Sequence, residues 1–384
     1  MIVGILGQGY VGFSLAMSAA NAENSVIGFE INPDVIVTCN NLIDSNNYEG
    51  TTDPTRLATV DVVVIAVPTP LDSQRKPDLS AINAACLTII EHIKKPVLVI
   101  NESTSYPGTL RREISEFIQS ESGINHLYAS APERVDPGSL SWNQKNTPRI
   151  ISGLTPEATN LARKFYETFC DNIVEVSSPE IAEAAKLFEN TFRQVNIALV
   201  NEFEQICNAL NIPTRQVLEA AATKPFGFMS FQPGPGVGGH CIPIDPSYLA
   251  YAAEKAGVEA TFIRHANEVN LAMPKYVVSK VIKEFGDIKG KKIVVVGVAY
   301  KPNVTDTRES PAALVIGALK ESGAHVSWHD PVVGTWSGEE SCQLTGFDLA
   351  VVVTKHDAIS ETSIKLSAPF IFDCTGSLKG VVGI

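Results

Sequence analysis

The fold of the first part of this 384-residue chain is decided by Ile2-Val3-Gly4-Ile5-Leu6-Gly7-Gln8-Gly9-Tyr10-Val11-Gly12. Ile2 to Leu6 is a short apolar run, typical of a buried parallel strand. The GxGxxG pattern follows at once, and the apolar residues from Phe13 to Ala22 then recur at helical spacing. A GxGxxG pattern alone is weak evidence. Its position between a strand and a helix makes it strong evidence for a dinucleotide-binding turn rather than a turn that only packs a helix.

A carboxylate stands where such a turn needs one. The second apolar run, Ser25 to Phe29, ends in Glu30, about 20 residues after the glycines, where an acid accepts hydrogen bonds from ribose hydroxyls. A carboxylate there would repel a 2′-phosphate, so the sequence favours NAD over NADP as the cofactor. The predicted cofactor contacts of this segment are Gly7, Gly9, Tyr10, Val11, Gly12 and Glu30.

The strand–helix alternation continues beyond the second strand. Four further apolar runs are predicted strands: Val60 to Val67, Pro96 to Asn101, Leu127 to Ala131 and Arg149 to Gly153. Polar loops follow three of them, at the carboxyl edge of the sheet, where ligands bind in open α/β folds. We therefore expect Thr69, Thr104 and Glu133 to line one crevice. The alternative for the two threonines is that they only cap the helices that follow.

A long helix is predicted in the middle of the chain, from about Pro179 to Leu210. Ser177-Ser178-Pro179-Glu180 combines a serine cap, a proline in the first turn and an acid beside the positive end of the helix dipole. Lys186, Asn190 and Arg193 project from one face of this helix. Because the helix is apolar on more than one side, we expect it to pack against a partner subunit and so to form a homodimer.

A second glycine-rich segment, Phe231 to Asp245, carries a cysteine at position 241. Its glycines allow a close approach of backbone to a ligand, and its prolines stiffen the loop. A tight, stiff loop of this kind is suited to present one reactive side chain, and Cys241 is the candidate. The alternative is a structural turn that contains a buried thiol.

The strand–helix alternation restarts after Ile288. We predict two Rossmann-like domains joined by the long central helix and a helical dimerisation domain, with boundaries at 1–176, 177–287 and 288–384. The last domain lacks a second GxGxxG pattern, so it need not bind a second dinucleotide. Pro274 is expected to mark a kink or a boundary in a helix from about Phe262 to Glu284.

Composition excludes several classes of protein. The formal net charge of −12 argues against a sequence-independent nucleic-acid binder. No apolar run approaches the roughly 20 residues that span a bilayer, and the first residues do not have the pattern of a signal peptide. The seven cysteines are scattered without a CxxC pair, which favours thiols in a cytoplasmic protein over a disulfide framework or a zinc site.

Several segments together resemble the UDP-glucose/GDP-mannose dehydrogenase family, in the same order and over essentially the whole chain. The most specific is Pro233 to Asp245, and the closest resemblance is to the branch acting on UDP-N-acetylhexosamines. The other matching segments are Gly7 to Gly12, Val67 to Leu71, Glu102 to Thr104, Pro132 to Val135 with Pro137-Gly138, Ala182-Glu183, Lys186 to Asn201, Ala299 to Asn303 and Asp306 to Pro311.

The resemblance implies an NAD-dependent, four-electron oxidation of a sugar C6 alcohol to a carboxylate through a thioester on Cys241. It implies that Lys186 and Asn190 stabilise the oxyanion, that Asp245 acts as a base, and that Glu133 and Thr104 position water. It also implies further contacts with the cofactor, by Thr69, Thr104 and Arg308. The implied substrate contacts are Glu133, Arg134, Val135, Lys186, Asn190, Arg193, Phe231, Gly238 and Lys301.

Two questions stay open from the sequence. The first is the substrate: the form Pro132-Glu133-Arg134-Val135 favours an acetamido sugar, and Pro137 stands where UDP-glucose enzymes often carry a second acid, although Asp136 beside it could substitute. UDP-glucose 6-dehydrogenase is therefore the alternative. The second is the class, because a two-electron hydroxyacid or sugar-phosphate dehydrogenase shares the NAD domain and the long helix, and a non-catalytic NAD-binding regulator is a further alternative.

Overall fold

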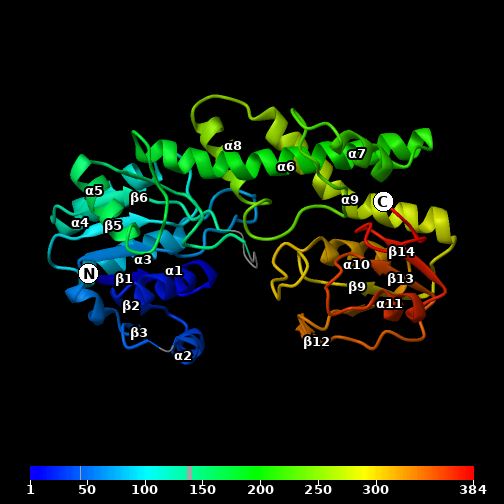
Figure 1. Ribbon diagram of the computed structural model, residues 1–384, viewed down its shortest axis with the longest axis horizontal. Helices are drawn as coiled ribbons and strands as arrows, with labels where there is room; N and C mark the ends of the chain where they lie inside the picture. Colours follow the sequence, from blue (N-terminus) through cyan, green and yellow to red (C-terminus); the bar gives the residue numbers. More distant parts are fainter. Residues whose placement is uncertain (44, 136–140) are drawn as a thin grey trace. The chain divides into compact units, whose positions relative to one another are not determined.

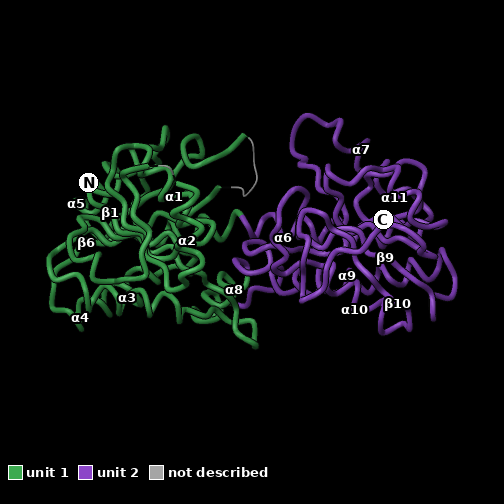
Figure 2. The backbone as a smooth tube through the Cα atoms, turned by 90° about the horizontal axis from the view of Figure 1, so that it is seen from below, with its two compact units in different colours: residues 1–189, 247–258 green, residues 190–246, 259–384 purple. Residues whose placement is uncertain are grey.

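The computed structural model describes residues 1–43, 45–135 and 141–384. Asp136, Pro137 and Gly138, on which part of the substrate argument depends, lie outside the described residues. Contacts group the chain into two compact units (Figure 2). Unit 1 consists of residues 1–189 and 247–258, and unit 2 consists of residues 190–246 and 259–384.

Unit 1 is built on a sheet that has eight strands in the described residues, in the order β3-β2-β1-β4-β5-β6-β7-β8. The order of its first six strands is that of a Rossmann dinucleotide-binding fold. All neighbouring strands are parallel except β6 and β7. The strands are β1 (Ile2–Leu6), β2 (Ser25–Phe29), β3 (Tyr48–Thr51), β4 (Val62–Ile65), β5 (Leu98–Asn101), β6 (Leu127–Ser130), β7 (Arg149–Gly153) and β8 (Ile173–Glu175).

Helices cover both faces of this sheet. Successive side chains of β4 show why: Val62 and Val64 pack into one apolar cluster with α1 and α5, while Val63 and Ile65 pack into another with α3 and η2. A parallel strand buried on both faces is apolar at every position. The helical segments are α1 (Tyr10–Asn21), α2 (Pro33–Leu42), η1 (Pro54–Thr59), α3 (Ser80–His92), η2 (Leu110–Ser115), α4 (Glu116–Ser122) and α5 (Pro156–Tyr166).

The long helix α6 (Pro179–Leu210) has the bounds that the sequence predicts and begins in unit 1 and ends in unit 2 (Figure 1). Three further helices follow: α7 (Thr214–Ala222), α8 (Asp245–Lys255) and α9 (Thr261–Phe285). Helix α9 continues through Pro274, which is buried inside it, so no helix boundary lies at this proline and the expected kink stays a prediction. Among the helices of the described chain, none is both long and apolar enough to cross a membrane.

Unit 2 contains a second parallel sheet, with five strands in the described residues, in the order β10-β9-β13-β14-β15. Its first four strands repeat the order β2-β1-β4-β5 of unit 1. Helices α9 and α10 pack on one face, and α11 packs on the other. The elements are β9 (Lys292–Val296), α10 (Pro311–Glu321), β10 (His325–His329), β13 (Leu349–Val352), α11 (Glu361–Ser367), β14 (Phe370–Asp373) and β15 (Val382–Gly383), with a two-stranded ribbon of β11 (Thr335–Trp336) and β12 (Glu339–Glu340).

The predicted fold class, two Rossmann-like folds with a long central helix, is confirmed. Most predicted strands lie within a few residues of the observed ones. Five strands and one helix that were not predicted from the sequence are short and carry few fully buried residues. They are β3, β8, β11, β12, β15 and α7. The three domain ranges remain a prediction, because the contacts divide the chain within α6 instead.

Candidate active site

The glycine-rich turn after β1 has the geometry that a dinucleotide requires. Gly7 has a φ of +91°, and a Cβ on it would lie 2.5 Å from the carbonyl oxygen of Ala66. A Cβ on Gly12 would lie 1.9 Å from the carbonyl oxygen of Gly7. A Cβ on Gly9 would meet no described atom within 4 Å. The chain's own packing therefore requires the first and third glycines, whereas the space at Gly9 is open for a pyrophosphate at the N-terminus of α1.

Glu30, directly after β2, is held in place and still able to bind a ligand. Its Oε2 accepts a hydrogen bond from the backbone N–H of Gln8 (3.0 Å), and its Oε1 accepts one from the N–H of Asn32 (3.1 Å). A carboxylate offers about four acceptor positions, so two remain for ribose hydroxyls. Glu30 is partly exposed. The residues of this turn thus fit NAD.

Lys186 is a buried residue of the site and not a surface lysine. Its Nζ donates a hydrogen bond to Oγ1 of Thr104 (2.7 Å), and the two residues are 7% and 6% exposed. Thr104 follows β5 closely, and Thr69, also buried, follows β4. Since β4, β5 and β6 are parallel neighbours in the sheet, Thr69, Thr104 and Glu133 all come after strand ends at its carboxyl edge, as predicted.

Glu133 is a buried carboxyl group among charges. Burial raises its pKa, while the nearby cations Lys186 and Arg149 lower it, and the net shift is upward. Its carboxylate also accepts a hydrogen bond from the backbone N–H of Val135. A carboxyl group with a raised pKa is suited to exchange protons with water during a reaction.

A buried ion pair beside Glu133 was not predicted from the sequence. Arg149 Nη1 lies 3.2 Å from Glu102 Oε1, which also accepts a hydrogen bond from the hydroxyl of Tyr166 (2.5 Å). The guanidinium lies 4.8 Å from the centre of the Tyr166 ring. In the sequence, Arg149 stands out only as a charged residue at the start of a predicted apolar strand. A cation so placed contributes to the field at Glu133.

The cysteine loop lies in unit 2. The backbone N–H groups of Ile244 and Asp245 donate to the carbonyl of Cys241 (3.2 and 2.9 Å), which ties the cysteine to the first turn of α8. Asp245 is fully buried, and its Oδ2 accepts a hydrogen bond from Nδ2 of Asn190 (2.7 Å). Asn190, Cys241 and Asp245 are therefore brought together. Lys186 lies one turn before Asn190 on α6.

The glycines beside Cys241 are required by the packing of this loop. A Cβ on Gly238 would lie 2.9 Å from both Cβ of Tyr300 and the carbonyl oxygen of Glu309, and one on Gly239 would lie 2.8 Å from the Tyr300 ring. The N–H of Gly239 also donates to the carbonyl of Arg308 (3.0 Å). The cysteine loop is thus pressed against the segments that carry Lys301 and Arg308. Gly238 packs on protein in this structure.

The remaining predicted contacts lie in different settings. The side chain of Arg308 pairs with Asp306 (2.6 Å), and this hydrogen bond, together with the charge of Asp306, raises the pKa of the guanidinium. Lys301 Nζ lies 5.7 Å from the centre of the Tyr300 ring. Three further predicted contacts are surface-directed or paired. They are Arg193, exposed on α6; Phe231, half-buried beside the ring of Phe192; and Arg134, whose guanidinium binds Glu189 (2.5 Å) and the carbonyl of Pro148 (2.8 Å).

In the described part of the chain, no three His, Cys, Asp or Glu side chains are grouped so that they could hold a metal ion. A dinucleotide turn with its ribose acid, together with a thiol on a glycine loop, defines the class of nicotinamide-dependent dehydrogenases with a candidate covalent nucleophile. The chain belongs to the UDP-glucose/GDP-mannose dehydrogenase family. The NAD binding domain of that family matches residues 38–170, its central domain residues 180–272 and its UDP binding domain residues 294–380. The protein is therefore an NAD-dependent oxidoreductase.

Named relatives of the chain come from archaea and bacteria. It is 34% identical to a UDP-N-acetyl-D-mannosamine dehydrogenase of Methanococcus maripaludis, over 98% of this chain and 92% of that protein. It is also 34% identical to a UDP-N-acetyl-D-glucosamine 6-dehydrogenase of Pseudomonas aeruginosa, over 86% of this chain and 83% of that protein. The solved structure of a UDP-D-ManNAc dehydrogenase from Pyrococcus horikoshii superimposes with a TM-score of 0.88 at 30% identity, covering 100% of this chain and 98% of that one.

Proposed function

We propose that the protein oxidises the C6 alcohol of a UDP-N-acetylhexosamine, either UDP-N-acetylmannosamine or UDP-N-acetylglucosamine, to the uronic acid. The observation that carries the proposal is that the half-buried Cys241 lies beside the buried Asp245, which is hydrogen bonded to Asn190. A two-electron hydroxyacid dehydrogenase needs no nucleophilic thiol, whereas a four-electron oxidation uses one to hold the aldehyde. The names of the relatives support the acetamido sugar.

The first oxidation needs a base and a group that stabilises the alkoxide. Asp245, acting with Lys186 through a water, takes up the proton of the C6 hydroxyl, and Lys186 stabilises the developing negative charge on oxygen. Lys186 is pre-oriented for this role, because its ammonium group is held by Thr104 in a buried position. When bound, NAD accepts one hydride in each of the two oxidations.

The second oxidation depends on a covalent bond to the protein. The Cys241 sulfur adds to the C6 aldehyde, forming a C–S bond, and the aldehyde oxygen becomes an alkoxide that Lys186 and Asn190 stabilise before it takes up a proton. Loss of the hydroxyl proton to solvent and of a hydride from C6 of this thiohemiacetal gives a thioester. Water then attacks the thioester carbon, the C–S bond breaks, and the carboxylate leaves while the thiol is restored. Glu133, with its raised pKa, and Thr104 position this water.

The same proposal includes a homodimer formed through α6. Phe192, Leu199 and Ile206 are exposed and follow one another at intervals of seven residues, so they lie along nearly one line of the helix. Leu210 continues this line, and Ile181 and Phe188 have the same spacing earlier in the helix. A row of large exposed apolar side chains on one long helix fits a second copy of the same row. We also propose that the protein is cytoplasmic and binds no nucleic acid, as its charge and thiols predict.

One assay tests the proposed reaction. The purified protein is incubated with NAD and with UDP-N-acetylmannosamine, UDP-N-acetylglucosamine or UDP-glucose, and the NADH formed per sugar consumed is counted. We expect two NADH per acetamido sugar and a uronic acid product. Turnover of UDP-glucose alone would favour the UDP-glucose 6-dehydrogenase alternative. One NADH per sugar would favour a two-electron enzyme, and no turnover of any sugar would favour a regulator.

A further inference from the structure

The second Rossmann-like sheet carries an acid at the position that binds ribose in the first. Strand β10 occupies the place of β2, because the order β10-β9-β13-β14 repeats β2-β1-β4-β5. Glu30 comes directly after β2, and Asp330 comes directly after β10. The two carboxylates therefore occupy equivalent positions. Their hydrogen bonds show whether each still has an acceptor position free for a ribose.

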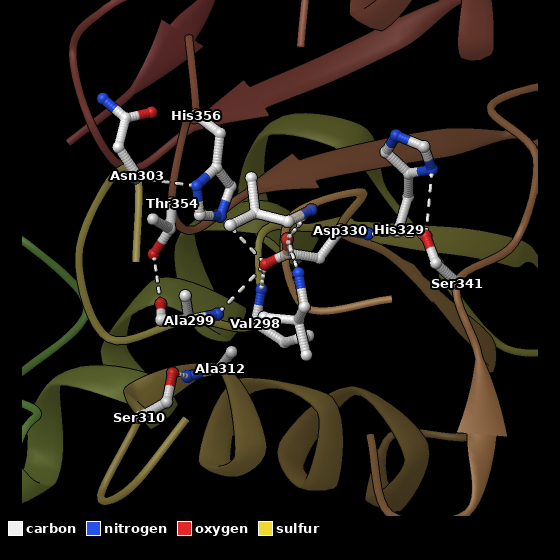
Figure 3. Close-up of polar contacts among 12 residues, drawn as sticks. Val298, Ala299, Asn303, Ser310, Ala312, His329, Asp330, Ser341, Thr354 and His356 are labelled. Carbon is white, nitrogen blue, oxygen red and sulfur yellow. Dashed lines mark hydrogen bonds and ion pairs between the residues drawn. The ribbon is translucent and has the colours of Figure 1, made fainter. Parts of the chain in front are cut away.

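The carboxylate of Asp330 accepts all its hydrogen bonds from its own chain. It is fully buried, and its Oδ2 accepts hydrogen bonds from the N–H groups of Val298 (2.9 Å) and Ala299 (3.1 Å) and from Nε2 of His356 (2.9 Å) (Figure 3). Its Oδ1 accepts two more, both 3.0 Å long, from backbone N–H groups that follow β10. Burial raises its pKa, but these hydrogen bonds outweigh burial and lower the pKa to about 2. Unlike Glu30, this carboxylate has no acceptor position left for a ribose.

His356, which donates to Asp330, also binds the chain at Asn303, five residues after Val298. Its Nδ1 accepts a hydrogen bond from the backbone N–H of Asn303 (2.9 Å), so the neutral ring carries its proton on Nε2 and donates it to Asp330. Asn303 has a φ of +63° and exchanges two hydrogen bonds with Asp357 (2.8 and 3.0 Å). The Oγ1 of Thr354 also donates to the carbonyl of Ala299 (2.8 Å).

These bonds hold residues 298–303 at both ends. At the start of this loop the N–H of Val298 donates to the carboxylate of Asp330, and at its end the N–H of Asn303 donates to the ring of His356. The side chains of Asp330 and His356 are hydrogen bonded to each other (Figure 3). Between the two ties lie Tyr300, which packs on the glycines beside Cys241, and Lys301, the substrate contact expected in this unit. A lysine side chain is flexible, so the position of its charge depends on how well its backbone is held.

We propose that Asp330 and His356 are positioning residues for the nucleotide part of the substrate, which fix the 298–303 loop so that Lys301 meets a uridine diphosphate. The inference rests on the proposed function. It also explains why the second sheet keeps an acid after β10 although it lacks the GxGxxG pattern: the acid holds the loop rather than a ribose.

The experiment measures the affinity of the full-length protein for UDP and, separately, for NAD by isothermal titration calorimetry. His356→Ala removes one donor from a buried carboxylate and the acceptor of a backbone N–H. We expect UDP to bind about tenfold or more weakly, as for a lost buried hydrogen-bond partner, with NAD affinity within about twofold of wild type. His356→Gln, which keeps a donor but loses the Nδ1 acceptor, is expected to show a smaller loss.

The matched control is His329→Ala. His329 lies next to Asp330 in sequence, and its ring is hydrogen bonded to the carbonyl of Cys342 (2.6 Å) and approaches Ser341, on the side away from the 298–303 loop (Figure 3). It should leave UDP affinity unchanged. Unchanged UDP affinity in folded His356→Ala and His356→Gln, or an equal loss of UDP and NAD affinity, would overturn the inference alone. A wild-type protein that binds NAD but no UDP would remove the proposed function and this inference with it.

Discussion

At the scale of single residues, the proposed chemistry depends on a thiol and on polar side chains whose surroundings differ. Lys186 and Asp245 are buried and hydrogen bonded, whereas Cys241 is half-buried. A substrate carbon can reach a half-buried thiol, while the buried partners keep fixed positions. This division is what a covalent mechanism needs, since the nucleophile meets the ligand and its supporting groups do not move.

Replacing the thiol should stop the second oxidation. In Cys241→Ala no C–S bond forms, so we expect no uronic acid above background in a product analysis with UDP-N-acetylmannosamine or UDP-N-acetylglucosamine. Cys342→Ala removes the other half-buried thiol and should retain full acid production. Normal acid production by Cys241→Ala would refute the covalent mechanism.

Glu30 is expected to account for a measurable part of NAD affinity. In Glu30→Ala the ribose hydroxyls and the N–H of Gln8 lose their acceptor, so NAD binding should weaken by about 1–3 kcal/mol. Calorimetric titration with NAD measures this difference. Asp34→Ala is the control, because Asp34 is an exposed acid in the first turn of α2. An unchanged affinity of Glu30→Ala would place ribose recognition elsewhere.

At the scale of elements, α6 does more than carry Lys186 and Asn190. Glu183, 1% exposed in its second turn, accepts hydrogen bonds from the backbone N–H groups of Gly108 (2.6 Å) and Leu110 (2.9 Å). It thereby ties α6 to the segment that follows Thr104. Burial raises the pKa of Glu183 from 4.5 to about 7 despite these hydrogen bonds.

The raised pKa gives the stability a pH dependence of known sign. The folded protein holds the Glu183 proton more tightly than the unfolded chain, so this stabilisation is present below about pH 4.5 and is lost as the pH rises through about 7. Between about pH 5 and about pH 8, the free energy of unfolding of wild type should fall by about 1–3 kcal/mol more than that of Glu183→Gln, which cannot ionise. Denaturant unfolding at the two pH values measures this.

The control for this prediction is Glu180→Gln on the same helix. Glu180 pairs with Arg111 (2.8 Å) near the surface, and this hydrogen bond lowers its pKa. Its replacement should therefore leave the fall in stability between the two pH values in place. If Glu183→Gln showed the same fall as wild type, Glu183 would not be the group responsible.

At the scale of the whole molecule, the exposed row on α6 predicts the oligomeric state. Leu199 is 63% exposed in the middle of the row, and its replacement by glutamate would place two like charges in a symmetric apolar interface. Light scattering should show a dimer for wild type and a monomer for Leu199→Glu. Gln205→Ala, at an exposed polar position about 120° around the helix from Leu199, should remain a dimer. A monomeric wild type would contradict the proposal.

The two sheets show how one topology serves two purposes. In unit 1, the acid after β2 keeps free acceptor positions, and Gly9 leaves open space beside it. In unit 2, the acid after β10 is saturated by its own chain. The presence of an acid after the second strand is visible in the sequence, but its use is visible only from its hydrogen bonds.

The sequence by itself determined what depends on short stretches: the GxGxxG turn, the strands around it, the bounds of α6 and the cysteine loop. These are local, since glycine content, capping and apolar spacing act within a few residues. Only the tertiary structure decided that Lys186 is buried on Thr104, that Arg149 pairs with Glu102, and that Asp330 pairs with His356. Each of these contacts joins residues far apart in the chain, and burial and charge pairing are set by which distant segments meet.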